Sequence, residues 1–291
     1  MATQITNKAT LNYNSGSDLL STSSNTAVVT MQGPLEVSKY SLENSYRVGD
    51  EITYNIFITN TSANTLTTLT IEDDLGTYAF NDTMNVTPLT YINPAKVFIN
   101  NVYSGTVNGV VSAEGDQVSF TINTLLPDAK LLLQYEAAVN EYAGAIIGTS
   151  NIDNIVSATA AGVASPVIAT NVLPVASYAD VSIEKTMFPD PVVDGSTLTY
   201  TFDISNYGTI PATNVVLQDA FTTLPTITSV TVDGVVLFST DYSYAEGVFQ
   251  YPATGAATPY EIPAATFTQD PATGVVGVTP STSTIIITGT I

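Results

Sequence analysis

The chain repeats its own pattern at a spacing of 146 residues. Lys39 corresponds to Lys185 and Asp73 to Asp219, and the differences 185 − 39 and 219 − 73 are both 146. The same spacing relates three further pairs, Tyr54 and Tyr200, Asn60 and Asn206, and Asn25 and Asn171. A fixed period of this length indicates tandem copies of a whole domain. Because 291 residues can bury two cores of ordinary size, the repeat predicts two domains.

Each copy alternates apolar and polar residues with the period of a half-buried β-strand. The alternating apolar positions are Ile52, Tyr54, Ile56 and Ile58 in the first copy and Leu198, Tyr200, Phe202 and Ile204 in the second. Asn100-Asn101 and Asp233-Gly234 each separate two strand-like runs, and these residue types tolerate the positive φ of a two-residue hairpin turn. The pattern predicts an all-β protein with an antiparallel β-sandwich in each copy.

The composition excludes many kinds of chemistry. The chain has no Cys and no His, which argues against zinc fingers, haem or iron–sulfur centres, and Cys or Ser-His nucleophiles. A net charge of −20 with six basic residues argues against binding to nucleic acid or anionic lipid. Neither a secretory signal nor an apolar run of about 20 residues is visible. We expect no cofactor, no nucleic-acid partner and no membrane insertion.

The acidic residues give little support for catalysis or metal binding. Glu72, Asp73 and Asp74 gather oxygen ligands that calcium prefers, but the twelve-residue calcium loop with its spacing is absent. Adjacent strand residues such as Asp73 and Asp74 face opposite sides of a sheet, so their carboxylates cannot converge on one substrate. The sequence therefore predicts a protein that is not an enzyme and that holds no metal.

A set of motifs resembles a known kind of repeat. The first copy has a strand ending at Lys39, then Val48-Gly49-Asp50-Glu51-Ile52-Thr53-Tyr54, Asn60 and Ile71-Glu72-Asp73, while the N-terminal segment carries Asn25-Thr26-Ala27. The second copy reverses the Gly-Asp order at Asp194-Gly195. These residues resemble the "conserved repeat domain" of prokaryotic surface proteins. The resemblance implies an immunoglobulin-like β-sandwich that serves as a building block of surface proteins, and it implies no single activity.

The N-terminal segment matches the strands that close the first domain. The run Gln4-Ile5-Thr6-Asn7-Lys8-Ala9-Thr10 recurs as Asn151-Ile152-Asp153-Asn154-Ile155-Val156-Ser157. The second occurrence closes a domain, whereas the first follows none, and the last domain ends at Ile291 where its counterpart still adds two strands. We therefore expect a donor-strand segment at 1–33, a first sandwich at 34–176 and an incomplete second sandwich at 177–291. The stretch 141–148 is expected to be a connector.

The extra strands at the N-terminus and the incomplete sandwich at the C-terminus predict head-to-tail assembly. To close its own tail, the N-terminal hairpin would have to cross a domain of roughly 40 Å on a few residues of about 3.3 Å each. Closing the next molecule needs no such reach, so the expected partner is the chain itself, in an extracellular filament on a cell or spore surface. Strand addition would satisfy sheet edges and fill the core. The expected anchors are Ile5, Ala9, Leu11, Tyr13, Val28 and Met31.

Lysine, aspartate and asparagine residues at matching positions could form covalent bonds, one within the first domain and one between neighbouring molecules. Lys39, Asp73 and Asn171 follow the chain order lysine, acid, asparagine, which resembles the self-crosslinking domains of Gram-positive pilins. There, a buried neutral lysine attacks an asparagine carboxamide while a carboxyl group moves protons. In the second domain, Lys185 and Asp219 would use Asn25 of the neighbouring molecule. The alternative is an ordinary Lys–Asp ion pair, with Asn25 and Asn171 making turn or edge hydrogen bonds.

Two other functions remain open on the sequence alone. An adhesin or ligand-binding module of a surface repeat protein would use exposed aromatic residues, and Tyr242, Tyr244 and Tyr251 could form such a patch. Tyrosines at strand spacing more often pack in a core. A fragment of a longer surface array would also leave unmatched strands at its two ends.

Overall fold

The computed structural model describes residues 3–31, 33–146 and 148–291. These residues form β-strands joined by turns, so the expected all-β fold is confirmed. No helix that could cross a bilayer occurs in this described part of the chain. The chain divides into two compact units. Unit 1 comprises Met1–Asn44, Gly49–Asn140 and Ile152–Leu173, and unit 2 comprises Ser45–Val48, Glu141–Asn151 and Pro174–Ile291.

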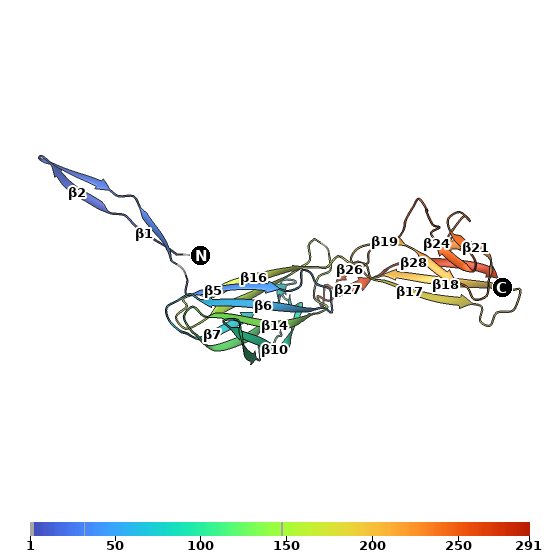
Figure 1. Cartoon of the computed structure of the whole chain (residues 1–291), viewed down its shortest axis with the longest axis horizontal. Helices are drawn as coiled ribbons and strands as arrows, with labels where there is room; N and C mark the ends of the chain where they lie inside the picture. Colours follow the sequence, from blue (N-terminus) through green and yellow to red (C-terminus); the bar gives the residue numbers. More distant parts are fainter. Residues whose placement is uncertain (1–2, 32, 147) are drawn as a thin grey trace. The chain divides into compact units, whose positions relative to one another are not determined.

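Unit 1 contains a sandwich of two five-stranded antiparallel sheets. The first sheet has the order β11 (Val102–Val107), β10 (Leu89–Ile99), β14 (Lys130–Val139), β6 (Glu51–Asn60) and β5 (Leu35–Ser41). The second has the order β12 (Val110–Val111), β13 (Val118–Leu125), β7 (Leu66–Asp73), β15 (Asn151–Thr159) and β16 (Val167–Pro174). Figure 1 shows β5, β6, β14 and β10 running side by side. Tyr135 of β14 contacts Phe120 of β13, with ring centroids 5.9 Å apart, which joins the two sheets.

Sequence alternation builds the core of this sandwich. The apolar positions predicted to point inward, Ile52, Tyr54, Ile56 and Ile58, are all fully buried. β14 and β15 alternate in the same way, so each strand presents one face to the space between the sheets. Burial of apolar side chains on both inner faces is the main favourable term holding the sandwich together.

Both predicted hairpin turns are confirmed. Asn100 and Asn101 have φ of 51° and 64° between the paired residues Ile99 and Val102. Asp233 and Gly234 have φ of 50° and 79° at the equivalent place in unit 2. Two positive φ values in a two-residue turn match the twist of the flanking strands.

Unit 2 repeats the first sheet and part of the second. Its large sheet has the order β17 (Val181–Phe188), β18 (Thr197–Asn206), β28 (Ser281–Thr290), β21 (Thr226–Val232) and β22 (Val235–Val236). It is accompanied by β20 (Leu217–Ala220), β24 (Val248–Tyr251) and β23 (Ser243–Ala245), and by the pairs β19 (Ala212–Val215) with β25 (Tyr260–Ile262) and β26 (Thr266–Gln269) with β27 (Val276–Thr279). The large sheet follows the strand order of β5, β6, β14, β10 and β11.

Asn60 and Asn206 show that the repeat is structural as well as sequential. Each side chain is fully buried, and each Nδ2 donates to three backbone carbonyl oxygens at corresponding positions. Each Oδ1 accepts a backbone N–H from the residue two positions later. The 146-residue spacing therefore relates equivalent corners of the two units.

The two units differ at one edge of the second sheet. In unit 1, β7 pairs with β13 on one side and with β15 on the other. In unit 2, β20 occupies the position of β7 and, within the described residues, pairs with β24 alone. The described part of unit 2 therefore lacks counterparts of β15 and β16, and β20 offers an open edge.

Residues 3–31 form a long hairpin whose described side chains are exposed. β1 (Thr3–Asn7) pairs with β4 (Ala27–Met31), and β2 (Thr10–Ser15) pairs with β3 (Asp18–Ser23). Ile5 lies opposite Val29, and Tyr13 lies opposite Leu20. A two-stranded hairpin with exposed apolar residues is marginally stable by itself.

Replacing a core residue of β6 should destabilise unit 1 far more than replacing its exposed neighbour. Ile56 is fully buried, so Ile56→Ala should cost about 2–5 kcal/mol of unfolding free energy through lost contacts and a cavity. Phe57 is 44% exposed, so Phe57→Ala should cost less than about 1 kcal/mol. Urea unfolding followed by tyrosine fluorescence measures both, and equal losses would contradict the inward assignment of Ile56.

Candidate functional site

The core of unit 1 contains a buried ion pair that joins its two sheets. Lys39 comes from β5 of one sheet, and Asp73 comes from the end of β7 in the other. Lys39 Nζ lies 2.6 Å from Asp73 Oδ2, and neither side chain is exposed to solvent. Because an isolated buried charge is very costly, the two groups must satisfy one another.

Two further polar side chains extend this pair into a network. The Tyr135 hydroxyl donates to Asp73 Oδ2 at 2.8 Å, and Asn154 Nδ2 donates to the Tyr135 hydroxyl at 2.9 Å. Asn154 is fully buried, and its Oδ1 has no hydrogen-bond partner among the described residues. We call these four residues, Lys39, Asp73, Tyr135 and Asn154, the unit 1 cluster.

Burial sets the electrostatics of the unit 1 cluster. Removal from water lowers the pKa of Lys39, and the neighbouring Asp73 charge opposes that change only in part. The Lys39 ammonium also lies 4.9 Å from the centroid of the Tyr54 ring. Burial raises the pKa of Tyr135 well above its usual value, so its hydroxyl keeps its proton and remains a donor. A lowered pKa makes the nucleophilic neutral form of a lysine easier to reach, and a neighbouring carboxyl group can move protons.

Asn154 is the asparagine that shares this network, whereas the order of residues in the sequence predicts Asn171. Asn154 lies in β15, which pairs directly with β7 so that Val156 is opposite Asp73. Asn171 lies in β16, one strand farther from β7, and its Oδ1 is buried with no partner among the described residues. A signal for Asn154 was present in the sequence, because the repeated run aligns it with Asn7.

The equivalent ion pair in unit 2 is open to water. Lys185 Nζ lies 2.7 Å from both carboxylate oxygens of Asp219. The side chains of Lys185 and Asp219 are 37% and 13% exposed, against 0% for both partners in unit 1. Inward positions of β17 are exposed too, since Val181 is 45% exposed while its counterpart Leu35 is 3% exposed. Among the described residues β20 has no counterpart of β15 beside it, which accounts for this difference.

The predicted strand anchors are exposed wherever the structure describes their side chains. Ile5, Ala9, Leu11, Tyr13 and Val28 all belong to the exposed hairpin, as does Asn25. The side chain of Met31 lies outside the described part of the structure. The hairpin therefore presents exposed apolar side chains at Ile5, Leu11, Tyr13 and Val28.

The calcium candidates do not converge on one point. Glu72 is exposed, Asp73 binds Lys39, and Asp74 Oδ1 accepts the backbone N–H groups of Gly76 and Ile155. Burial raises the pKa of Asp74, and those two hydrogen bonds oppose the change. Among the residues that the structure describes, no group of three or more acidic side chains could hold a metal ion.

The tyrosines considered for an adhesive patch pack against the core of unit 2. Tyr242, Tyr244 and Tyr251 are partly buried there. Tyr242 lies 5.4 Å from Phe249 and Tyr251 lies 5.1 Å from Tyr260, measured between ring centroids. Aromatic pairs at these distances stabilise a core, so the spacing of these tyrosines reflects packing.

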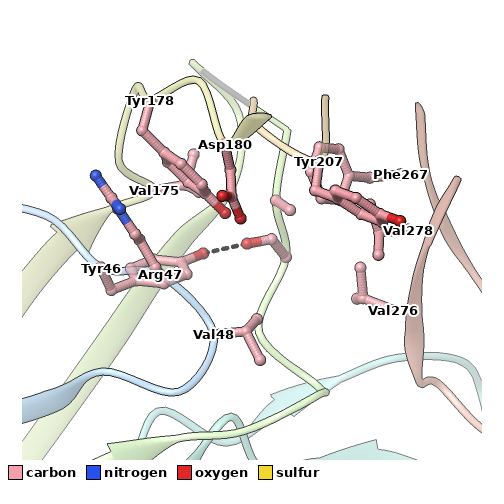
Figure 2. Close-up of a pocket in the computed structure, with 12 residues that line it drawn as sticks. Tyr46, Arg47, Val48, Val175, Tyr178, Asp180, Tyr207, Phe267, Val276 and Val278 are labelled. Atoms are coloured by element: carbon pink, nitrogen blue, oxygen red, sulfur yellow. Dashed lines mark hydrogen bonds between the residues drawn. The ribbon is translucent and has the colours of Figure 1, made fainter. Parts of the chain in front are cut away.

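Unit 2 also contains a pocket of about 310 Å³, shown in Figure 2. Its lining residues are Tyr46, Arg47, Val48, Gly144, Ala145, Val175, Tyr178, Asp180, Tyr207, Phe267, Val276 and Val278. The Arg47 guanidinium stacks 3.9 Å from the centroid of the Tyr178 ring, and the Tyr46 hydroxyl donates to the Gly144 carbonyl at 2.6 Å. These polar groups therefore already have partners inside unit 2.

Comparisons with known proteins give similarity to pilins. No family model matches the sequence, and no curated protein matches it. The chain is similar to a 35 kDa C-terminal fragment of the major pilin GBS80 of Streptococcus agalactiae, at 12% identity and a TM-score of 0.36, covering 88% of this chain and 79% of that one. It is also similar to the major pilin BcpA of Bacillus cereus, at 12% identity and a TM-score of 0.37, covering 86% of this chain and 66% of that one. A third similar structure is the major pilin SpaD of Corynebacterium diphtheriae, at 14% identity and a TM-score of 0.35, covering 78% of this chain and 50% of that one.

Removing one partner of the buried ion pair should be costly, and the matched change in unit 2 should not be. Lys39→Met leaves Asp73 buried without its counter-charge, which should cost about 3–5 kcal/mol, and adding Asp73→Leu should recover most of that loss. Lys185→Met removes an exposed partner and should cost less than about 1 kcal/mol. Urea unfolding of the three variants checks this. Equal effects of the two lysine substitutions would contradict the difference in burial.

Proposed function

We propose that the protein is a non-enzymatic structural subunit of an extracellular filament on a cell or spore surface. Subunits join head to tail, and the hairpin at residues 3–31 of one molecule supplies the two strands that unit 2 of the next lacks. The observation that carries the proposal is the match between an exposed apolar hairpin and an open edge at β20. The hairpin sequence recurs in β15 and β16, which fill that place in unit 1.

The register of the hairpin supports one inward face. Opposite residues of paired antiparallel strands share a face, so Ile5 shares a face with Val29, while Val28 shares the other face with Thr6. β15 buries Ile152 and Ala158, the counterparts of Ile5 and Leu11. The proposed inward apolar residues are therefore Ile5, Leu11, Tyr13, Leu20 and Val29. In this arrangement Val28 lies on the outward face.

Strand addition gives such a joint both specificity and strength. Main-chain hydrogen bonds would complete the open edge, and alternate side chains would enter the core. At about 1.5–3 kcal/mol for each large apolar side chain, four or five of them contribute on the order of 10 kcal/mol before ordering costs. Because two different surfaces meet, repetition of the contact produces an open filament unless the rotation closes a ring.

Charges on the inward face of the hairpin should prevent assembly, and the same charges on the outward face should not. The double variant Ile5→Asp with Leu11→Asp should form no filaments, because two carboxylates would have to enter a core. The matched variant Thr6→Asp with Asn12→Asp adds the same charge and should assemble. Negative-stain microscopy and pelleting report the outcome, and filaments of normal appearance in the first variant would refute strand donation.

We also propose that the unit 1 cluster forms an isopeptide bond. Lys39 Nζ attacks Asn154 Cγ, the Nζ–Cγ bond forms, and the Cγ–Nδ2 bond breaks. The amide nitrogen leaves as ammonia after receiving a proton from the attacking amine by way of Asp73 and Tyr135, and nothing is oxidised or reduced. The buried lysine, the adjacent carboxyl group and the hydrogen bond from Tyr135 to Asp73 support this step.

Intact mass should report this bond. The monomer should be lighter than its sequence by one ammonia, about 17 Da, because the bond expels one amide nitrogen. Asn154→Ala should restore the full mass, whereas Asn171→Ala should keep the deficit. An unmodified mass in the wild-type chain would refute the bond and leave the ion pair, and a deficit that disappears only with Asn171→Ala would move the bond to Asn171.

A further inference from the structure

The Lys185–Asp219 pair has the position of the unit 1 cluster, but none of the described residues supplies an asparagine there. Lys185 corresponds to Lys39, Asp219 corresponds to Asp73, and the distances within the two ion pairs are 2.7 and 2.6 Å. In unit 1 the asparagine comes from β15, and the described residues of unit 2 place no counterpart of β15 beside β20. An asparagine at this position must therefore come with the strand that fills the open edge.

We infer that Asn7 of a second copy of the chain occupies this position and becomes bonded to Lys185, so that each joint between subunits is covalent. This inference rests on the proposed strand donation. It differs from the sequence-based expectation, which placed Asn25 opposite Lys185. Asn7 aligns with Asn154 in the strand next to β7, whereas Asn25 aligns with Asn171 in the strand beyond it.

The pairing in unit 1 fixes the expected register. Val156 lies opposite Asp73 and Ser157 lies opposite Glu72. Transferred to the joint, Ala9 lies opposite Asp219 and Thr10 lies opposite Gln218. Asn7 is then two residues from Ala9, on the same face of its strand and directed to the same side as Asp219. Donation of this strand would cover the ion pair and remove it from water.

The chemistry at the joint is simpler than in unit 1. In unit 1, Tyr54 lies opposite Tyr135. Tyr200 is the counterpart of Tyr54 in unit 2, and it lies opposite Ile287. Ile287 therefore stands in unit 2 where unit 1 has Tyr135. Lys185 Nζ attacks Asn7 Cγ, the Cγ–Nδ2 bond breaks, and Asp219 passes the amine proton to the nitrogen that leaves as ammonia. No oxidant or co-reactant is needed.

The test compares filaments with detergent-resistant ladders in the full chain. Wild-type filaments boiled in detergent should give a ladder of multiples of the subunit, containing a branched peptide that joins Asn7 to Lys185 with the loss of one ammonia. Asn7→Ala and Asp219→Ala should still form filaments by microscopy but dissolve to monomers. Asn25→Ala should keep the ladder. Asn7 lies in an exposed hairpin, so its substitution leaves the fold of both units intact.

Each failure has its own signature. A ladder that survives Asn7→Ala, or that disappears with Asn25→Ala, overturns the assignment of Asn7. Wild-type filaments that dissolve to monomers overturn the covalent bond and keep strand donation. A wild-type chain that forms no filaments overturns the proposed function, and this inference with it.

The register can be tested independently because the natural chain contains no cysteine. In an Asn7→Ala background, the pair Thr10→Cys with Gln218→Cys should give a disulfide ladder that reducing agent removes, since directly opposite residues bring their Cβ atoms close enough for a bond. The pair Asn12→Cys with Gln218→Cys is shifted by two residues and should give far less. Equal ladders, or a stronger ladder from the shifted pair, would overturn the register.

Discussion

The pairing of β15 with β7 is the contact on which the core of unit 1 depends. It covers Asp73 from the side and delivers Asn154 to the space between the sheets. Asp73 then holds Lys39, so that β5 is tied to the opposite sheet through a charge–charge contact inside the core. In unit 2 the same lysine and aspartate meet without that strand, and their pair is exposed. The presence of one strand thus decides whether a lysine and an aspartate form a buried ion pair, which is costly to desolvate but strong, or a weaker solvent-exposed ion pair.

Much of the fold could be predicted because it depends on local patterns. The alternation at Ile52 to Ile58 marks an inward face, and the structure buries all four apolar residues. Asn100-Asn101 and Asp233-Gly234 adopt the positive φ values that their residue types permit. The spacing of Asn60 and Asn206 identifies equivalent corners, since both side chains bind corresponding carbonyl oxygens. Each of these features depends on residues close in sequence or on a direct repeat.

The candidate site needed information that sequence order does not carry. Lysine, acid and asparagine in that order fit both Asn154 and Asn171, and the choice depends on which strand lies beside β7. Likewise, the apolar character of Val28 does not reveal its face, which follows from its pairing with Thr6. The spacing of Tyr242 and Tyr251 in the sequence is compatible with a surface patch and with core packing, and only the structure shows that they pack against Phe249 and Tyr260. In all three cases the missing information is cross-strand or cross-sheet register.

The chain passes through unit 1 from one end of the strands to the other. It begins β5 at Leu35, which is paired with Asn60, and β5 then runs to Lys39, which meets Asp73 at the end of β7. The chain leaves β16 next to the start of β15, the strand paired with that end of β7. A donated hairpin that replaces β15 and β16 would be held in the same way, by its own chain at one end and by the receiving subunit at the other. In the proposed filament, tension would then act parallel to these strands. Their hydrogen bonds would share the load and break together, which resists pulling better than opening them one at a time.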